Sequence, residues 1–505
     1  MTIDGADIGK DLHELAEAVV IGSGAGGAVV ARELAARGRD VVLLEEGGFF
    51  TRRDFTGNPP AMLDLLYRDR GLTGTIGRPF IPIPLGRCVG GTTTINSGTC
   101  YRAPDWVLDD WAERHGVTGA REGDLRPWFE RIEVDLGVQP VDDAAYGRNS
   151  RLFEQGAAQL GWAGARIPRN ARGCVGSGVC AFGCPQDAKQ ATHVGHVPRA
   201  LADGARLFTR CRVERVLLSH GHAIGVIGRF LDTSGRPTGR ELRVLARHVI
   251  VACGALLTPA LLERSGVPDP SGMRGRNLHV HPAVRVGALF DEPVRGWEEV
   301  PQAYNLHQFT REGIFIQGQF VPPAMAAPVL PGVGLAHKAR MARFANLASF
   351  GALISDESAG RVRATRSGFP RVTYQMNAAD ARRMARAVGL TAEVFFTAGA
   401  REVYSGVHSR AVLRGLHDAH ALQQATLPPA EFELMAFHPQ GTAKMGEDRV
   451  RAVTDSWGRV HGTGGLWVGD ASLFPSSCKV NPQITIMALA ARLAARVADE
   501  LPAKG

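Results

Sequence analysis

The chain has 505 residues, and its 45% hydrophobic and 21% charged content is typical of a globular protein long enough for two domains. No apolar run is long enough to cross a membrane and no export signal opens the chain, so we expect a cytoplasmic protein with reduced cysteines. The net charge of +8 is spread without basic clusters and aromatic residues amount to 7%, which disfavours nucleic acid as a partner.

The N-terminal region predicts a βαβ unit. The elements expected from its pattern, in chain order, are a polar helix over 11–17, a buried strand over 18–21, the turn GSGAGG, a helix over 28–37 and a strand over 40–44. Gly22, Gly24 and Gly27 have the spacing that lets a backbone approach a pyrophosphate at a helix N-terminus, and Ala25 belongs to the same turn. Glu45 follows the second strand, where a carboxylate can bind the hydroxyls of an adenosine ribose. This combination predicts a dinucleotide site.

The middle of the chain predicts a loop, a small meander and another buried strand. Residues 49–85 are rich in proline and glycine and should form an extended covering loop. Strands over 205–208, 212–217 and 223–230 should form the meander. An apolar strand over 246–253 should run into a glycine turn and a helix over 258–264.

From about residue 280 to 435 the pattern changes to alternation, which predicts antiparallel strands such as 361–365 and 370–375, followed by a helix over 379–398. We therefore predict an α/β protein with two domains. Residues 1–278 and 437–505 should form a discontinuous, Rossmann-like domain with a parallel sheet. Residues 279–436 should form a substrate domain with a mostly antiparallel sheet.

Two further motifs bear on the cofactor and the chemistry. GRCVGGTTTINSGT (86–99) is a second glycine turn with hydroxyls and an asparagine, and its backbone donors suit the N5 and carbonyl edge of an isoalloxazine, which favours FAD. Near the C-terminus, His438 stands between an apolar strand and a glycine turn, Asp470 ends a strand, and Asn481-Pro482 opens a helix. A base, a carboxylate and a helix N-terminus suit an anionic cofactor beside a proton-transfer group.

These motifs resemble those of the glucose–methanol–choline (GMC) oxidoreductases, FAD-dependent enzymes that act on alcohols, over nearly the full chain. GALLTPALLERSGV (254–267), with Pro268 in place of the usual glycine, and RNLHVHP (276–282) also fit the family. The resemblance implies His438 as the catalytic base and Asn481 as its partner. It further implies a flavin and adenine site formed by Gly90, Gly91, Thr92, Asn96, Val213, Asp470 and Pro482. Ile95 stands where some members attach FAD through a histidine, so we expect non-covalent FAD.

The predicted reaction is oxidation of a small-molecule alcohol. His438 accepts the hydroxyl proton, Asn481 binds the same oxygen and places the carbon over flavin N5, which takes the hydride. O₂ or another acceptor then reoxidises the flavin. A lyase of the same fold, which retains FAD without reducing it, and a non-catalytic flavin-binding subunit are the alternatives. The pocket should come from residues 49–85 and 300–350, whose side chains predict an apolar lining without specifying the alcohol.

Cysteines are concentrated in GCVGSGVCAFGCPQDAK (173–189). Cys174, Cys180 and Cys184 follow the spacing of a ferredoxin run in which Ser177 replaces one cysteine. Three thiolates could hold an iron–sulfur cluster, or zinc together with His193 or His196, but a loop of reduced cysteines without metal is the favoured interpretation. We expect packing or solvent roles for the remaining pairs and single residues, namely His220, His222, His279, His281, Cys88, Cys100, Cys253 and Cys478.

Overall fold

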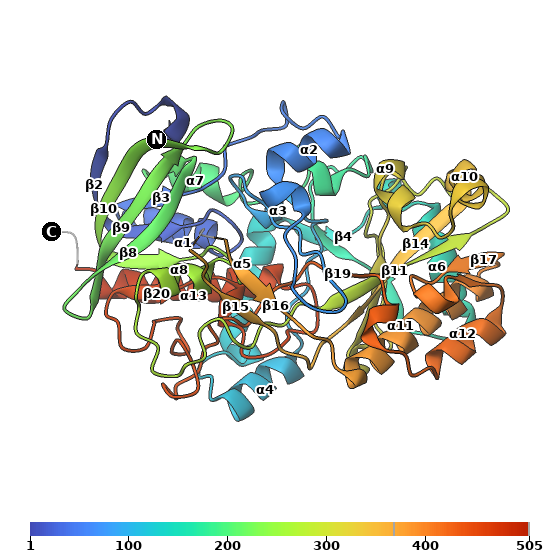
Figure 1. The fold of residues 1–505 in the computed structure, drawn as a ribbon. Helices are drawn as coiled ribbons and strands as arrows, with labels where there is room; N and C mark the ends of the chain where they lie inside the picture. Colours follow the sequence, from blue (N-terminus) through green and yellow to red (C-terminus); the bar gives the residue numbers. More distant parts are fainter. Residues whose placement is uncertain (367–368, 503–505) are drawn as a thin grey trace.

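The computed structural model describes residues 1–366 and 369–502. Figure 1 shows two lobes side by side, each built on one large sheet, with both chain ends in the lobe at the left. Each lobe has its own large hydrophobic core. Within the described ranges, none of the helices combines the length and the apolar composition that crossing a membrane would need.

The first lobe is built on an eight-stranded, largely parallel sheet. Its parallel strands, in spatial order, are β1 (Thr2–Asp4), β7 (Arg206–Thr209), β3 (Val41–Leu44), β2 (Leu12–Ile21) and β10 (Pro237–Val251). The end of β10 also pairs in parallel with β20 (Leu466–Val468), and its beginning pairs antiparallel with β9 (His222–Leu231), which pairs with β8 (Cys211–Ser219). The helices of this lobe include α1 (Gly27–Ala35), α4 (Asp105–His115), α5 (Glu122–Leu136), α7 (His196–Ala202), α8 (Thr258–Arg264) and α13 (Gln483–Glu500). The predicted Rossmann-like layer with a parallel sheet is confirmed.

Three local predictions for this lobe were wrong. Residues 11–17 are not helical, because they extend β2 and pair with β10 from Leu12 onward, so tertiary pairing overrides local helix propensity. Residues 205–208 do not belong to the meander, because β7 lies between β1 and β3 in the parallel sheet. Residues 49–85 are not loop throughout, because they contain α2 (Pro59–Leu66), whose first turn is capped by the Asn58 side chain.

The second lobe is built on an antiparallel sheet, as predicted. Its strands, in spatial order, are β18 (Val412–Leu413), β17 (Glu402–Tyr404), β11 (Pro282–Leu289), β14 (Leu347–Ile354), β13 (Ile314–Gly318), β12 (Tyr304–Leu306) and β5 (Gly164–Arg166), and β19 (Leu434–Ala436) also pairs with β11. One face buries Val284, Ile316 and Phe350 in the core that α11 (Ala378–Thr397) covers. The other face is turned toward the first lobe and forms part of the cavity described below.

The predicted limits of this domain, 279–436, remain a prediction. β5 joins the second sheet, and α6 (Arg148–Gln159) packs against α11, although both precede residue 279. A unit that included them would draw on two separate stretches of chain, 148–166 and 279–436. The predicted strands near 361 and 371 are confirmed as β15 (Arg361–Arg363) and β16 (Arg371–Thr373), which form a separate pair. Residues 367–368 and 503–505, within the predicted domain ranges, lie outside the described residues.

The parallel strands position the site. β2, β3, β10 and β20 run in the same direction, so their carboxyl ends meet at one edge of the sheet. The residues that follow these ends include Gly22, Glu45, Gly254 and Asp470. The carboxyl edge of an open parallel sheet is where such folds bind dinucleotides.

Candidate active site

A cavity of about 1470 Å³ lies at this edge, between the two sheets. It exceeds the usual ~300–1,000 Å³ of a site for one drug-sized ligand, so it has room for a dinucleotide and a second molecule. Most of the predicted site residues line it, namely Gly22, Gly24, Ala25, Glu45, Gly91, Thr92, Asn96, Val213, His438, Asp470, Asn481 and Pro482. The structure therefore brings residues from both chain ends to one cavity.

Glycines of the first turn have two distinct roles. A Cβ on Gly24 would meet no atom within 4 Å, so this position is open toward the cavity. A Cβ on Gly27 would lie 1.9 Å from the Gly22 carbonyl oxygen, so Gly27 serves close packing and does not line the cavity. Gly90 lies behind the wall as well, and its N–H donates to the Ser23 hydroxyl at 3.0 Å, which joins the two glycine turns.

Two buried carboxylates hold the strand ends in place. Glu45 accepts hydrogen bonds from the Ser23 N–H (3.1 Å), the Ser23 hydroxyl (2.6 Å) and the Gly47 N–H (2.9 Å). Asp470 accepts from the Gly254 N–H (2.8 Å) and the Thr258 hydroxyl (2.5 Å). Burial raises the pKa of both carboxyls, while these donors oppose the rise. Both carboxylates line the cavity, where they suit the hydroxyl groups of a dinucleotide.

The second glycine turn is anchored by a lysine that sequence reasoning missed. Lys189 is buried, and its ammonium donates to the carbonyl oxygens of Thr94 (2.8 Å), Asn96 (2.6 Å) and Cys180 (2.8 Å). The Asn96 side-chain amide also donates to Gln483 in the first turn of α13. The loop is thus held by the cysteine segment on one side and by the C-terminal helix on the other.

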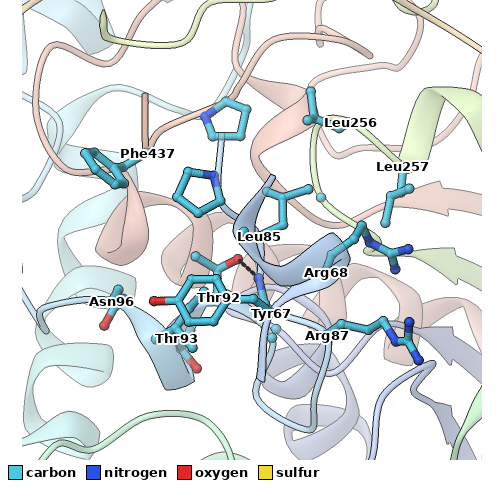
Figure 2. Close-up of a pocket in the computed structure, with 18 of the residues that line it drawn as sticks. Tyr67, Arg68, Leu85, Arg87, Thr92, Thr93, Asn96, Leu256, Leu257 and Phe437 are labelled. Carbon is cyan, nitrogen blue, oxygen red and sulfur yellow. Dashed lines mark hydrogen bonds between the residues drawn. The ribbon is translucent and has the colours of Figure 1, made fainter. Parts of the chain in front are cut away.

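The two ends of the cavity differ in character. Figure 2 shows Arg68 and Arg87 on one side and the rings of Tyr67 and Phe437 with Asn96 on the other. Arg68 forms an ion pair with Glu46 at 2.5 Å. The cationic end suits the charged part of a dinucleotide, and the aromatic end leads to the histidine.

His438 and Asn481 face each other at the aromatic end. The Asn481 amide nitrogen lies 3.2 Å from Nε2 of His438, and the Asn481 amide oxygen is buried with no hydrogen-bond partner among the described residues. Burial lowers the pKa of His438 to about 4, so the ring is neutral at pH 7. A neutral imidazole can accept a proton from a bound hydroxyl group at Nε2, and the Asn481 amide N–H can donate to the oxygen of that group.

A backbone irregularity presents His438 to the cavity. The strand pair β11–β19 matches Pro282 with Ala436, and farther along His279 pairs with Gln440. Between these two pairs, the segment that leads into β11 has two residues, 280–281, whereas the segment that follows β19 has three, 437–439. The extra residue is a bulge of the kind that redirects a side chain near an active site.

His281 is a residue for which the sequence predicted only a packing or solvent role. Its ring is buried, with Nδ1 3.3 Å from Nδ1 of His438 and Nε2 2.5 Å from the Ser477 hydroxyl. Its backbone has a positive φ of 49°, and the Asp356 carboxylate accepts from the N–H groups of Val280 and His281. The alternating NLHVHP pattern predicts a strand and gives no sign of this turn. The contact between His281 and His438 follows only from the fold.

The cysteine segment packs beside the site, against Arg169. The Arg169 guanidinium donates to the sulfurs of Cys174 (3.7 Å) and Cys180 (3.3 Å). Among residues 1–366 and 369–502, no three His, Cys, Asp or Glu side chains are grouped so that they could hold a metal ion, so the iron–sulfur and zinc alternatives find no ligand set there. Four other cysteines were predicted to be buried. Three of them are buried, namely Cys88, Cys100 and Cys478, whereas Cys253 is partly exposed to the cavity.

Comparison with known proteins decides the family. Sequence profiles described as GMC oxidoreductase match residues 63–283 and 356–490, and one described as an NAD(P)-binding Rossmann-like domain matches residues 20–56. The chain is 42% identical over 492 residues to a GMC-type oxidoreductase of Mycobacterium tuberculosis, covering 97% of this chain and 76% of the relative. The chain belongs to the GMC oxidoreductases. It is accordingly an FAD-dependent enzyme that acts on alcohols.

Two more distant likenesses also extend over nearly the whole of this chain. A long-chain-alcohol oxidase of Arabidopsis thaliana is 28% identical over 530 residues, covering 99% of this chain and 69% of the relative. Among solved structures, pyridoxine 4-oxidase of Mesorbium loti superposes with a TM-score of 0.72 at 18% identity, covering 95% of this chain and 99% of that one. The second likeness concerns the fold alone.

The cavity of this GMC oxidoreductase fits FAD. The open position at Gly24 and the N-terminus of α13 suit a pyrophosphate and a polar ring edge, and Glu45 and Asp470 suit hydroxyl groups. Bound FAD supplies the two-electron acceptor that alcohol oxidation requires. That the attachment is non-covalent remains a prediction, which rests on Ile95.

Proposed function

We propose that this enzyme oxidises an alcohol to an aldehyde or ketone, with His438 as the base and Asn481 as the group that positions the hydroxyl. The observation that carries the proposal is the pair itself. Nε2 of His438 and the amide nitrogen of Asn481 lie 3.2 Å apart, and both belong to side chains that line the cavity. An alcohol hydroxyl placed between these two groups can donate its proton to Nε2 while the Asn481 amide N–H donates to the hydroxyl oxygen.

The surroundings support this role. Burial keeps His438 neutral at pH 7. The long-chain-alcohol oxidase relative supports an alcohol as the reductant, and the apolar side chains of Leu85, Phe320 and Phe437 in the cavity suit its carbon chain. The electrons then leave to O₂ or another acceptor.

The test is anaerobic mixing of the purified holoenzyme with a panel of alcohols. Loss of the visible flavin absorption shows oxidation, and a parallel oxygen-consumption assay identifies the acceptor. His438→Ala should slow the bleaching by roughly 10²- to 10⁴-fold with FAD retained. Cleavage of a substrate without bleaching would support the lyase instead. No reaction with any alcohol or artificial acceptor would support the non-catalytic alternative.

A further inference from the structure

A row of polar side chains crosses the cavity side of the second sheet. Pairing of β11 with β14 matches Arg285 with Gly351, and pairing of β13 with β14 matches Gln317 with the same glycine. Directly paired residues in antiparallel strands point to the same face, so Arg285 and Gln317 flank a position that has no side chain. The Gln319 amide oxygen lies 2.7 Å from the place that a Cβ on Gly351 would take. Arg285, Gln317 and Gln319 all line the large cavity.

This row faces the interior of the molecule. The alternate residues of the same strands, such as Val284 and Phe350, are buried in the apolar core on the other side of the sheet. Around the polar row, the cavity wall is mainly apolar and includes Phe320, Val321, Pro322, Met325 and Met435. A charged side chain in these surroundings is costly unless a partner compensates it.

The protein supplies no such partner among its described residues. No acceptor in residues 1–366 and 369–502 lies within hydrogen-bonding or ion-pair distance of the Arg285 guanidinium, and the carboxylate that acts on it from farther away, Glu433, is exposed. Burial lowers the pKa of Arg285 to about 10, so the group stays protonated at neutral pH. The neighbouring Gln317 side chain is buried, and its amide N–H groups can donate to a carboxylate.

We propose that Arg285 binds a carboxylate at the end of the substrate remote from the oxidised hydroxyl group, with the amides of Gln317 and Gln319 beside it. The proposal rests on alcohol oxidation at His438. Arg285 lies four residues along the chain from His281, whose ring contacts His438. At ~3.3 Å per residue, the backbones of Arg285 and His281 are separated by roughly 13 Å. The substrate class is therefore a hydroxy acid with an apolar chain of about that length between its two polar ends.

The single positive charge of Arg285 favours a carboxylate over a phosphate as the bound group. Arg285 is the one cation among the described residues that the second sheet and residues 319–329 contribute to the cavity. One guanidinium neutralises one negative charge and matches a carboxylate with two parallel hydrogen bonds, whereas a phosphate monoester would bring about two charges into the same apolar wall.

The test measures binding to the holoenzyme without turnover. Decanoate and decanamide, which have equal length and no hydroxyl, are titrated while the flavin spectrum is recorded. We expect decanoate to bind roughly 10- to 100-fold more tightly, the usual range for a hydrogen-bonded charge pair. Arg285→Met should abolish this preference. Glu433→Gln is the matched control and should preserve it, because Glu433 does not line the cavity.

Each outcome decides the proposal. Equal binding of the two probes, or a preference that survives in Arg285→Met, overturns it. If Arg285→Met does not retain FAD, Arg285→Lys decides, because lysine keeps the charge without the paired donors and should reduce the preference several-fold. The titration measures binding without catalysis. It therefore tests the carboxylate site even if the enzyme does not oxidise alcohols. In turnover, the ratio of kcat/KM for 10-hydroxydecanoate over 1-decanol should fall by a similar factor in Arg285→Met.

Discussion

Replacement of His281 tests how the base is held. The Asn481 amide nitrogen faces Nε2 of His438 at 3.2 Å, so Nε2 accepts and the neutral ring carries its proton on Nδ1. That N–H points to Nδ1 of His281 at 3.3 Å, and Nε2 of His281 lies 2.5 Å from the Ser477 hydroxyl and 3.1 Å from the Gln440 amide nitrogen. His281 therefore helps to hold the proton of His438 on Nδ1, so that Nε2 is the nitrogen that takes the substrate proton.

Two substitutions separate the two contacts of His281. Asparagine is short, so His281→Asn keeps an acceptor near Nδ1 of His438, and asparagine tolerates the positive φ of this position. Glutamine is longer, so His281→Gln reaches toward Ser477 and leaves Nδ1–H of His438 unpaired in a buried place. An unmade buried hydrogen bond costs about 1–3 kcal/mol, which predicts a roughly 5- to 150-fold loss of kcat/KM for His281→Gln. We expect His281→Asn to lose less than about 5-fold on the same reasoning.

The assay is the rate of anaerobic flavin bleaching by an alcohol that the wild-type enzyme oxidises. FAD content and the unfolding midpoint Tm are recorded for each variant, so that lost cofactor is not mistaken for lost chemistry. Equal rates in His281→Gln and His281→Asn, at equal FAD content, would refute the assignment of His281 as a positioning residue. A loss that tracks Tm in both variants would show that His281 serves the fold alone.

Three further predictions concern the same cavity. The base must be neutral, and burial lowers the pKa of His438 to about 4, so kcat/KM should be retained from pH 8 down to about 5 and lost as the pH falls through about 4. A loss of kcat/KM that begins near the ordinary histidine pKa, ~6.5, would contradict the burial argument. The Gly24→Ala variant should fold with a normal Tm yet lose FAD, because the added Cβ would point into the open cavity. The Gly26→Ala variant should have a much lower Tm, because the added Cβ would lie 1.7 Å from the Gly469 carbonyl oxygen. Equal Tm values for the two variants would refute this distinction. Asp470→Ala leaves the Gly254 N–H and the Thr258 hydroxyl without their acceptor, so it should lower Tm and FAD affinity, at a cost of about 1–3 kcal/mol of stability per unmade bond. Asp470→Asn keeps an acceptor oxygen and should recover part of the Tm and part of the FAD affinity. Thermal-shift and FAD-release measurements compare the two variants.

The parallel layer and its cofactor turn were predictable from local sequence. The strand ending at Ile21, the turn at Gly22 and the acid at Glu45 each carry a short-range pattern, and the helix Thr258–Arg264 was predicted with its observed limits. The strand over 12–17 was not predictable in the same way, because its conformation comes from pairing with β10, more than 200 residues away.

For the site, the sequence by itself determined the chemical groups: His438, Asn481, the two carboxylates and the glycine turns all stand in recognisable motifs. Only the tertiary structure decided what surrounds them. The contact of His281 with His438, the three carbonyl bonds of Lys189 and the alignment of Arg285 with Gln317 across Gly351 join segments that no local pattern connects. The physical reason is that a motif encodes backbone turns and side-chain chemistry within a few residues. The distance between groups on different strands is set by the register and packing of two whole sheets.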